Sequence, residues 1–153
     1  MKKFTFLFLL LCFSCEEETN SNQNSEFLFV ASEGNYGDSN GSITMFNGNE
    51  KIHTLENVGD VVQSILVHDD KLFVAVNNSH LIKRFTITET GLQLPGIQIS
   101  TENSSPREMV VLEDNLYFTN WFSKDIKVLN LTTFSIEESI SIDGVPEDII
   151  TDG

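Results

Sequence analysis

Apolar and polar residues alternate in short runs along most of the chain after residue 25, and turns rich in Asn, Asp and Gly separate these runs. Alternation with a period of two is typical of β-strands, because successive side chains point to opposite faces of a sheet. Beyond residue 25 the sequence shows no sustained helical period. The pattern therefore predicts an all-β fold.

The strand pattern recurs at a fixed interval of 44 residues, which aligns Leu28–Ala31, Leu72–Ala75 and Leu116–Thr119. A second run follows each of these, at Ser42–Phe46, Leu81–Phe85 and Asp125–Leu129. A third run precedes the last two, at Ser64–Val67 and Glu108–Val111, and a weaker fourth run closes the unit, at Gly96–Ile99 and Glu138–Ile142. Four short strands per repeat of about 40–45 residues are typical of β-propeller blades.

The repeat predicts a β-propeller of four-stranded antiparallel blades, at roughly residues 26–62, 63–107 and 108–147. Residues 148–153 align with the first strand of a further blade and the turn after it. Because a ring needs about four or more blades to close, we expect a truncated propeller of about three blades. A β-sandwich is the main alternative, but it does not account for the 44-residue period.

Residues 1–14 read as a leader. Lys2 and Lys3 precede the apolar run Phe4–Phe13, which is shorter than the ~20 residues that a membrane-spanning helix needs. This arrangement is typical of a secretory signal peptide. The segment Cys12–Cys15 resembles a bacterial lipoprotein signal, with Cys12 where Leu is usual, and it predicts lipidation of Cys15. The alternative is simple cleavage and release into the periplasm.

Residues 15–25 form a polar, acidic tether. The triplet Glu16–Glu18 resembles the export signal of surface-exposed lipoproteins, and the alternative is a solvated linker. The formal net charge of the chain is −14, which argues against nucleic acid and anionic lipid surfaces as partners. Both cysteines lie within the first fifteen residues, so the domain at 26–153 has no disulfide and no thiolate metal site.

In a blade, the loop entering the first strand and the loop between strands two and three lie at the same end. The candidate ligand-binding residues fall on these loops: Glu33, Asn35, Tyr36, Gln63, Asn77, Asn78, Arg107, Trp121 and Phe122. The Trp121–Phe122 pair suits an amphipathic ligand with a flat face, and Arg107 could orient a carboxylate, amide or phosphate. The alternatives are packing of Trp121 between blades, an ion pair of Arg107 with Glu108 or Glu147, and turn formation by the Asn residues.

The chain lacks the motifs of common catalytic and metal sites. Its three histidines have no metal-ligand spacing, and neither a Gly-x-Ser-x-Gly motif nor a phosphate loop is present. We therefore predict a non-enzymatic protein without a metal or cofactor. The enzymatic alternative is a propeller lactonase or hydrolase with an axial metal, for which only Glu33, Asn77 and Asp148 are plausible ligands, at repeat offsets that differ.

Several motifs resemble YncE-like propeller lipoproteins: Glu33–Gly37 with Asn40–Ile43, Gly59–Ser64, Val76–Ser79 and Ser105–Arg107. The resemblance covers residues 27–153 and implies a seven-bladed ring. The family includes surface lipoproteins that capture cobalamin and other corrinoids for a TonB-dependent outer-membrane transporter. The resemblance thus implies a lipid-anchored, surface-exposed protein of the outer membrane that binds a small nutrient, with a corrinoid as the named candidate. A surface scaffold for protein interactions is the alternative.

Overall fold

The computed structural model describes residues 26–152, so the predicted leader, Cys15 and the tether lie outside the described residues. The described chain is built from β-strands and turns. The strands are β1 (Phe27–Ser32), β2 (Ser42–Asn47), β3 (Glu50–Leu55), β4 (Val62–His68), β5 (Lys71–Val76), β6 (Leu81–Thr88), β7 (Gly91–Ser100), β8 (Pro106–Leu112), β9 (Asn115–Asn120), β10 (Asp125–Asn130) and β11 (Ile136–Ser141). Within residues 26–152, no helix is long and apolar enough to cross a membrane.

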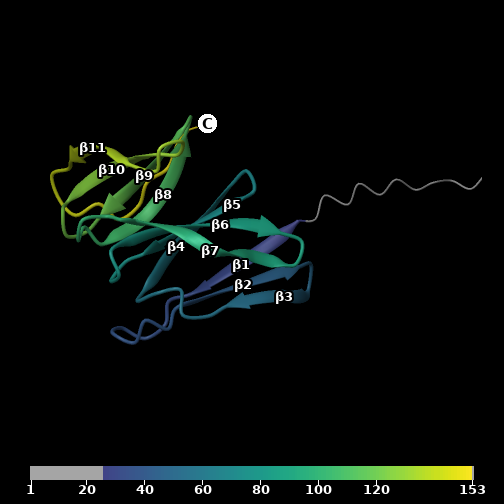
Figure 1. Cartoon of the computed structure of the whole chain (residues 1–153). Helices are drawn as coiled ribbons and strands as arrows, with labels where there is room; N and C mark the ends of the chain where they lie inside the picture. The colour runs from purple at the N-terminus through teal and green to yellow at the C-terminus, as the bar shows by residue number, and fades with distance from the viewer. Residues whose placement is uncertain (1–25, 153) are drawn as a thin grey trace, which may run out of the picture.

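The strands form three antiparallel sheets that fan out side by side (Figure 1). The strand order is β1-β2-β3 in the first sheet, β4-β5-β6-β7 in the second and β8-β9-β10-β11 in the third. Strand β8 is thus the counterpart of β4. We call these sheets the first, second and third blades. Strand β4 contacts β1 and β8, and β3 contacts β7, so each blade packs on its neighbour in the chain. The predicted all-β architecture of repeated antiparallel units is confirmed.

The first blade differs from the prediction in having three strands among the described residues rather than four. The alignment makes the reason clear, since β1 corresponds to β5 and β9, the second strands of the later blades. Strand β3 was not predicted. Its sequence, EKIHTL, begins with two charged residues and shows only weak alternation, so the pattern there is too faint to indicate a strand.

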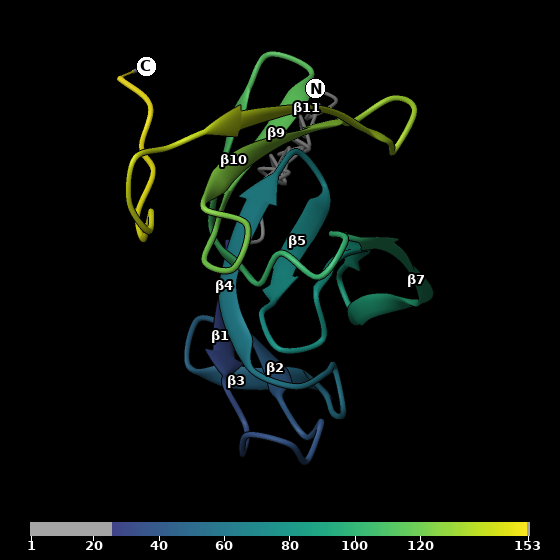
Figure 2. The same ribbon diagram turned by 90° about the vertical axis from the view of Figure 1, so that its left-hand side faces the viewer.

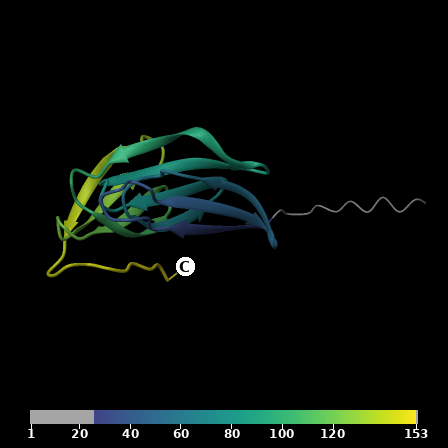
Figure 3. The same cartoon turned by 90° about the horizontal axis from the view of Figure 1, so that it is seen from below.

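Residues 148–151, predicted as the first strand of a further blade, are not a strand in the structure. After β11 the chain leaves the third blade and runs as an irregular segment (Figures 2 and 3). A strand forms where a neighbouring strand satisfies its backbone N–H and C=O groups, and none of the three described sheets includes this segment. The alignment with β4 and β8 is present in the sequence, but these residues are not part of a described sheet.

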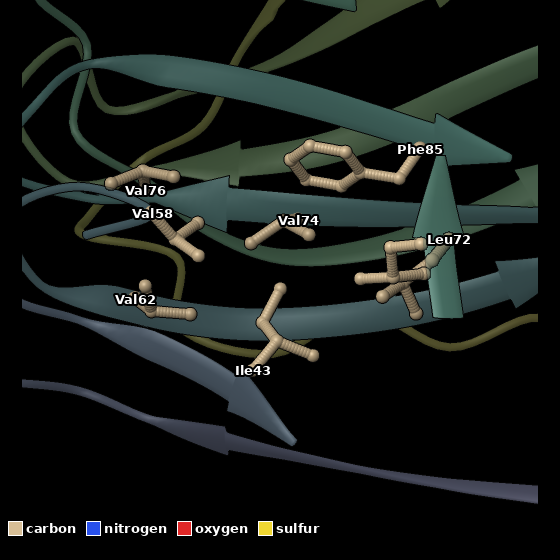
Figure 4. Packing of buried hydrophobic residues seen from close by; sticks show 8 residues of the cluster. Ile43, Val58, Val62, Leu72, Val74, Val76 and Phe85 are labelled. Atoms are coloured by element: carbon tan, nitrogen blue, oxygen red, sulfur yellow. The ribbon is translucent and has the colours of Figure 1, made fainter. Parts of the chain in front are cut away.

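The core lies between the blades rather than inside any one of them. Side chains of β5 alternate, so that Leu72 and Val74 face the first blade while Phe73 faces the third. Figure 4 shows Ile43 of the first blade pointing toward Val74 of the second. Burial of each such side chain contributes about 1.5–3 kcal/mol. The blades therefore depend on one another for stability, and their stacking fixes the position of the loops that join the strands.

Candidate functional site

Loops from all three blades meet at one end of the fan. We call this surface the loop face, and it comprises residues 33–41, 57–61, 77–80, 101–105, 121–124 and 143–147. Asp60 joins the first two blades there, since one of its carboxylate oxygens accepts a hydrogen bond from Gly37 N at 2.9 Å and the other accepts one from Asn78 Nδ2 at 2.5 Å. Its side chain is buried, so these bonds hold the loops in place without competition from water.

Position 59, directly before Asp60, has no room for a side chain and is occupied by glycine. Its φ is +155°, and a Cβ atom would lie 2.5 Å from Val76 Cγ1. Gly41 N donates to Gly59 O at 3.0 Å, and this bond joins the 33–41 loop of the first blade to the segment that connects β3 with β4. The close approach of the chain to β5 thus depends on glycine.

The loops of the second and third blades are joined through backbone groups. Ser105 N donates to His80 Nδ1 at 3.1 Å, and Trp121 N donates to Ser105 O at 3.0 Å. Phe122 N donates to Ser104 O at 2.9 Å, and its ring lies 5.8 Å from the His80 ring, tilted by 50°. The Trp-Phe pair therefore lies on a loop whose backbone is fixed to the preceding blade.

Arg107 is the centre of a side-chain cluster, the Arg107 cluster, which also contains Gln63, Trp121 and Glu147. Arg107 Nη1 donates to Gln63 Oε1 at 2.8 Å, and its Nε and Nη2 donate to Glu147 Oε2 at 2.9 and 2.8 Å. The guanidinium carbon lies 4.4 Å from the centre of the Trp121 ring, a cation–π arrangement. Trp121 Nε1 donates to Glu147 Oε1 at 2.5 Å. The ion pair between Arg107 and Glu147 is one of the alternatives left open by the sequence, and the structure contains it.

Three members of this cluster stand at equivalent positions of the repeat. Gln63 and Arg107 are each the second residue of their strand, β4 and β8. Glu147 is the residue that aligns with them at the start of the next unit. The cluster therefore extends from blade to blade, and each unit contributes one side chain from this repeat position.

The next residues in the repeat, Ser64, Glu108 and Asp148, lie beside this cluster. Burial raises the pKa of the Glu108 carboxyl above its ordinary value of 4.5, and the negative charge of Asp148 raises it further, while Arg107 and a hydrogen bond from Ser64 lower it. Ser64 Oγ also donates to Arg107 O at 2.6 Å. Burial and the neighbouring carboxylate thus make Glu108 a weaker acid than usual.

The remaining candidate residues have structural roles or are exposed. Asn77 Nδ2 donates to Pro106 O at 3.0 Å and so fastens the second blade to the third. Asn35 forms a local turn, as its Nδ2 donates to Asp38 Oδ2 at 3.1 Å. Glu33 and Tyr36 are exposed on the same loop, and no side-chain hydrogen bond among the described residues joins them to the Arg107 cluster. The structure thus brings together Gln63, Arg107 and Trp121, places Phe122 next to them, and leaves the 33–41 loop apart.

Two important residues were missing from the sequence-based set, namely Asp60 and Glu147. Asp60 sits between Gly59 and the apolar pair Val61–Val62, and an acidic residue in such a setting is a usable signal of a buried acceptor. Glu147 was considered only as a possible ion-pair partner of Arg107, and its alignment with Gln63 and Arg107 was the signal that it belongs to the same cluster.

The Arg107 cluster offers aromatic surface more than free polar groups. Trp121 uses its one N–H donor on Glu147, and Arg107 uses three of its five N–H donors on Gln63 and Glu147, so two donors of Arg107 remain for a polar ligand. The Trp121 and Phe122 side chains remain 40% and 67% exposed. Within the part of the chain that the structure describes, no group of three or more His, Cys, Asp or Glu side chains is arranged to hold a metal ion.

The chain matches no known family model and no curated protein. Among solved structures, a chain of the nidogen/laminin complex superposes with a TM-score of 0.59 at 10% identity, over 76% of this chain and 43% of that one. The WD40 β-propeller domain of Doa1 gives a TM-score of 0.58 at 14% identity, over 76% and 41%. The described residues form part of a β-propeller.

AztD from Citrobacter koseri is also similar in structure, with a TM-score of 0.53 and 18% identity, over 75% of this chain and 33% of that one. The propeller chain described above therefore spans between 33% and 43% of the length of these solved chains. At such identities the likeness shows the fold alone.

Proposed function

We propose that this chain belongs to a non-enzymatic, lipid-anchored cell-surface protein that binds a small amphipathic nutrient at the loop face. The observation that carries the proposal is the exposure of Trp121 and Phe122 on a loop whose backbone is fixed to Ser104 and Ser105. Large aromatic side chains that are exposed yet held in place lose little conformational entropy when they contact a ligand.

A corrinoid is the proposed ligand. Its macrocycle is flat and apolar across its faces, which suits aromatic surface, and its amide side chains suit polar neighbours such as Gln63 and Glu147. The resemblance of the loop motifs to YncE-like lipoproteins supports the same ligand class. The proposal includes anchoring through Cys15 in the outer membrane and delivery to a TonB-dependent transporter.

The experiment is calorimetric titration of the full chain with cyanocobalamin. The variant Trp121→Ala should weaken binding by about tenfold or more, as expected for an aromatic residue at the centre of a binding surface. Phe134→Ala is the matched control, because Phe134 also lies beneath an arginine, Arg84 at 4.1 Å, but outside the loop face. Absence of binding at high micromolar concentration, or equal losses in both variants, would contradict the proposal.

A surface for protein interaction is the second candidate. Tyr36 favours it, because this side chain is 81% exposed and lies on the 33–41 loop, outside the Arg107 cluster. Aromatic residues of this kind are common at the centre of protein interfaces. Cross-linking of the full chain to an outer-membrane transporter that Tyr36→Ala abolishes, in the absence of any corrinoid binding, would support this candidate over the first.

A further inference from the structure

A lateral groove lies between the first and second blades, where β3 and β7 run side by side. Its volume is about 530 Å³, within the range of small-molecule sites, about 300–1,000 Å³. The walls are mainly apolar and come from Leu55, Val58, Phe85, Leu94, Pro95 and Ile97. No member of the Arg107 cluster lines it, so the groove is separate from that cluster, although Asn57 and Val58 of the loop face border the groove.

Lys83 is the one cation in the lining of this groove. Its Nζ donates to Val58 O at 2.5 Å, and it forms no ion pair with any carboxylate of the described residues. An ammonium group has three N–H donors, so this bond leaves two for another acceptor. The one acid in the lining, Glu56, is exposed and is not paired with Lys83.

Among the described Lys and Arg residues, Lys51, Lys83, Arg84 and Lys124 form no ion pair with a carboxylate, and Lys51 and Lys124 are exposed to water, unlike Lys83. Lys71, Arg107 and Lys127 each pair with a carboxylate. Lys83 is half-buried among apolar groups instead, and this burial lowers its pKa from the ordinary value. A desolvated cation without an anion is costly, and an anion placed beside it would offset that cost.

We propose that this groove binds a small amphipathic carboxylate, whose apolar tail lies against Phe85, Leu94 and Pro95 and whose carboxylate accepts hydrogen bonds from Lys83 Nζ. The two requirements on the ligand come from the two parts of the groove. The apolar walls select a hydrocarbon tail, and the unpaired ammonium selects a negative head over a neutral one.

The experiment compares octanoate with its neutral analogue octanamide, by calorimetry on the full chain at pH 7 and by amide chemical shifts of Gly96 and Ile97. The variant Lys83→Met keeps the apolar stem of the side chain and removes the charge. We expect it to weaken octanoate binding by about tenfold or more and to leave octanamide within about twofold. Leu94→Ser should weaken both ligands, because it removes part of the shared apolar wall.

Leu94 is an exposed residue, so this second variant tests the groove even if Lys83→Met does not fold. Octanoate that binds Lys83→Met as tightly as the unaltered chain would overturn the proposal. So would octanoate at millimolar concentration that leaves the Gly96 and Ile97 amides of the unaltered chain unshifted. Both readouts are independent of corrinoid binding at the loop face.

Discussion

Gln63 and Arg107 stand 44 residues apart at the same position of successive blades, and Arg107 Nη1 donates a hydrogen bond to Gln63 Oε1 over 2.8 Å. Equivalent residues of neighbouring blades meet because the blades are stacked side by side with their first strands, β4 and β8, in contact. The bond continues through Arg107 to Glu147, so one repeat position joins three units.

Removing Arg107 should loosen this junction. Arg107→Ala deletes the bond to Gln63, the ion pair with the half-exposed Glu147 and the contact with Trp121. Because solvent screens the exposed ion pair, we expect a loss of only about 1–2 kcal/mol in the free energy of unfolding, measured by urea denaturation. Lys124→Ala, at an exposed position on the same face, is the control and should change stability by less than about 0.5 kcal/mol. Equal losses of stability in the two variants would show that the Arg107 cluster does not hold neighbouring blades together.

Glu108 should make stability depend on pH. Its pKa is raised in the folded chain, so the folded state binds more protons than the unfolded state between the ordinary value of 4.5 and the raised value. The stability contribution of Glu108 therefore falls as the pH rises through that window. Glu108→Gln should stabilise the chain at pH 7 and have almost no effect below the ordinary pKa.

Thermal unfolding of Glu108→Gln across this pH range is the measurement. Glu89→Gln, in the exposed turn between β6 and β7, controls for the removal of one negative charge from an acidic chain. A stabilisation by Glu108→Gln that does not change with pH would show that the cause is not the ionisation of this partly buried carboxyl group.

Gly59 should be more sensitive to substitution than Gly37, another glycine of the loop face. Gly59→Ala places a Cβ atom 2.5 Å from Val76 Cγ1, whereas at Gly37, where φ is +89°, a Cβ atom would meet nothing within 4 Å. We expect Gly37→Ala to cost about 1 kcal/mol for its left-handed backbone, and Gly59→Ala to cost about 1–3 kcal/mol more. Chemical denaturation compares them, and similar losses would argue against the close approach of residue 59 to β5.

The outer side of the first blade should promote self-association. Leu28 and Val30 of β1 are 58% and 44% exposed, and within the described residues β1 pairs only with β2. An exposed apolar strand edge is a template for association with other chains. The double variant Leu28→Lys/Val30→Lys should reduce the aggregate fraction in light scattering, while Tyr36→Lys, which removes an exposed apolar side chain elsewhere, should not. If both variants reduce it equally, general hydrophobicity is the cause rather than the edge.

The sequence predicts most of this fold because the repeat makes each strand support the assignment of its counterparts. Leu72–Ala75 alone is an ambiguous apolar run, but its alignment with Leu28–Ala31 and Leu116–Thr119 indicates a strand in all three. Strand β3 was missed because its pairing with β2 creates a strand from a weakly alternating sequence. Residues 148–151 show the converse, since their alignment with β4 and β8 does not make them part of a sheet.

The site is less predictable for a similar reason. Sequence position shows which loops share a face, but not which side chains satisfy one another across it. Arg107 had two possible acidic partners, and only the geometry between β8 and residue 147 selects Glu147. Asn77 reads as a turn residue or a ligand donor, yet its amide binds Pro106 O of the next blade, a contact that depends on the packing of the two blades.

Side-chain NOEs in the full chain test the central claim most directly, namely that blades 44 residues apart stack and gather their loops on one face. The account predicts cross-peaks between Gln63 and Arg107 and between the His80 and Phe122 rings, whose centres are 5.8 Å apart. Their presence together would place loops of the second and third blades side by side. Absence of both, in a chain whose cross-strand NOEs show β5 and β9 intact, would contradict the stacking on which the loop face depends.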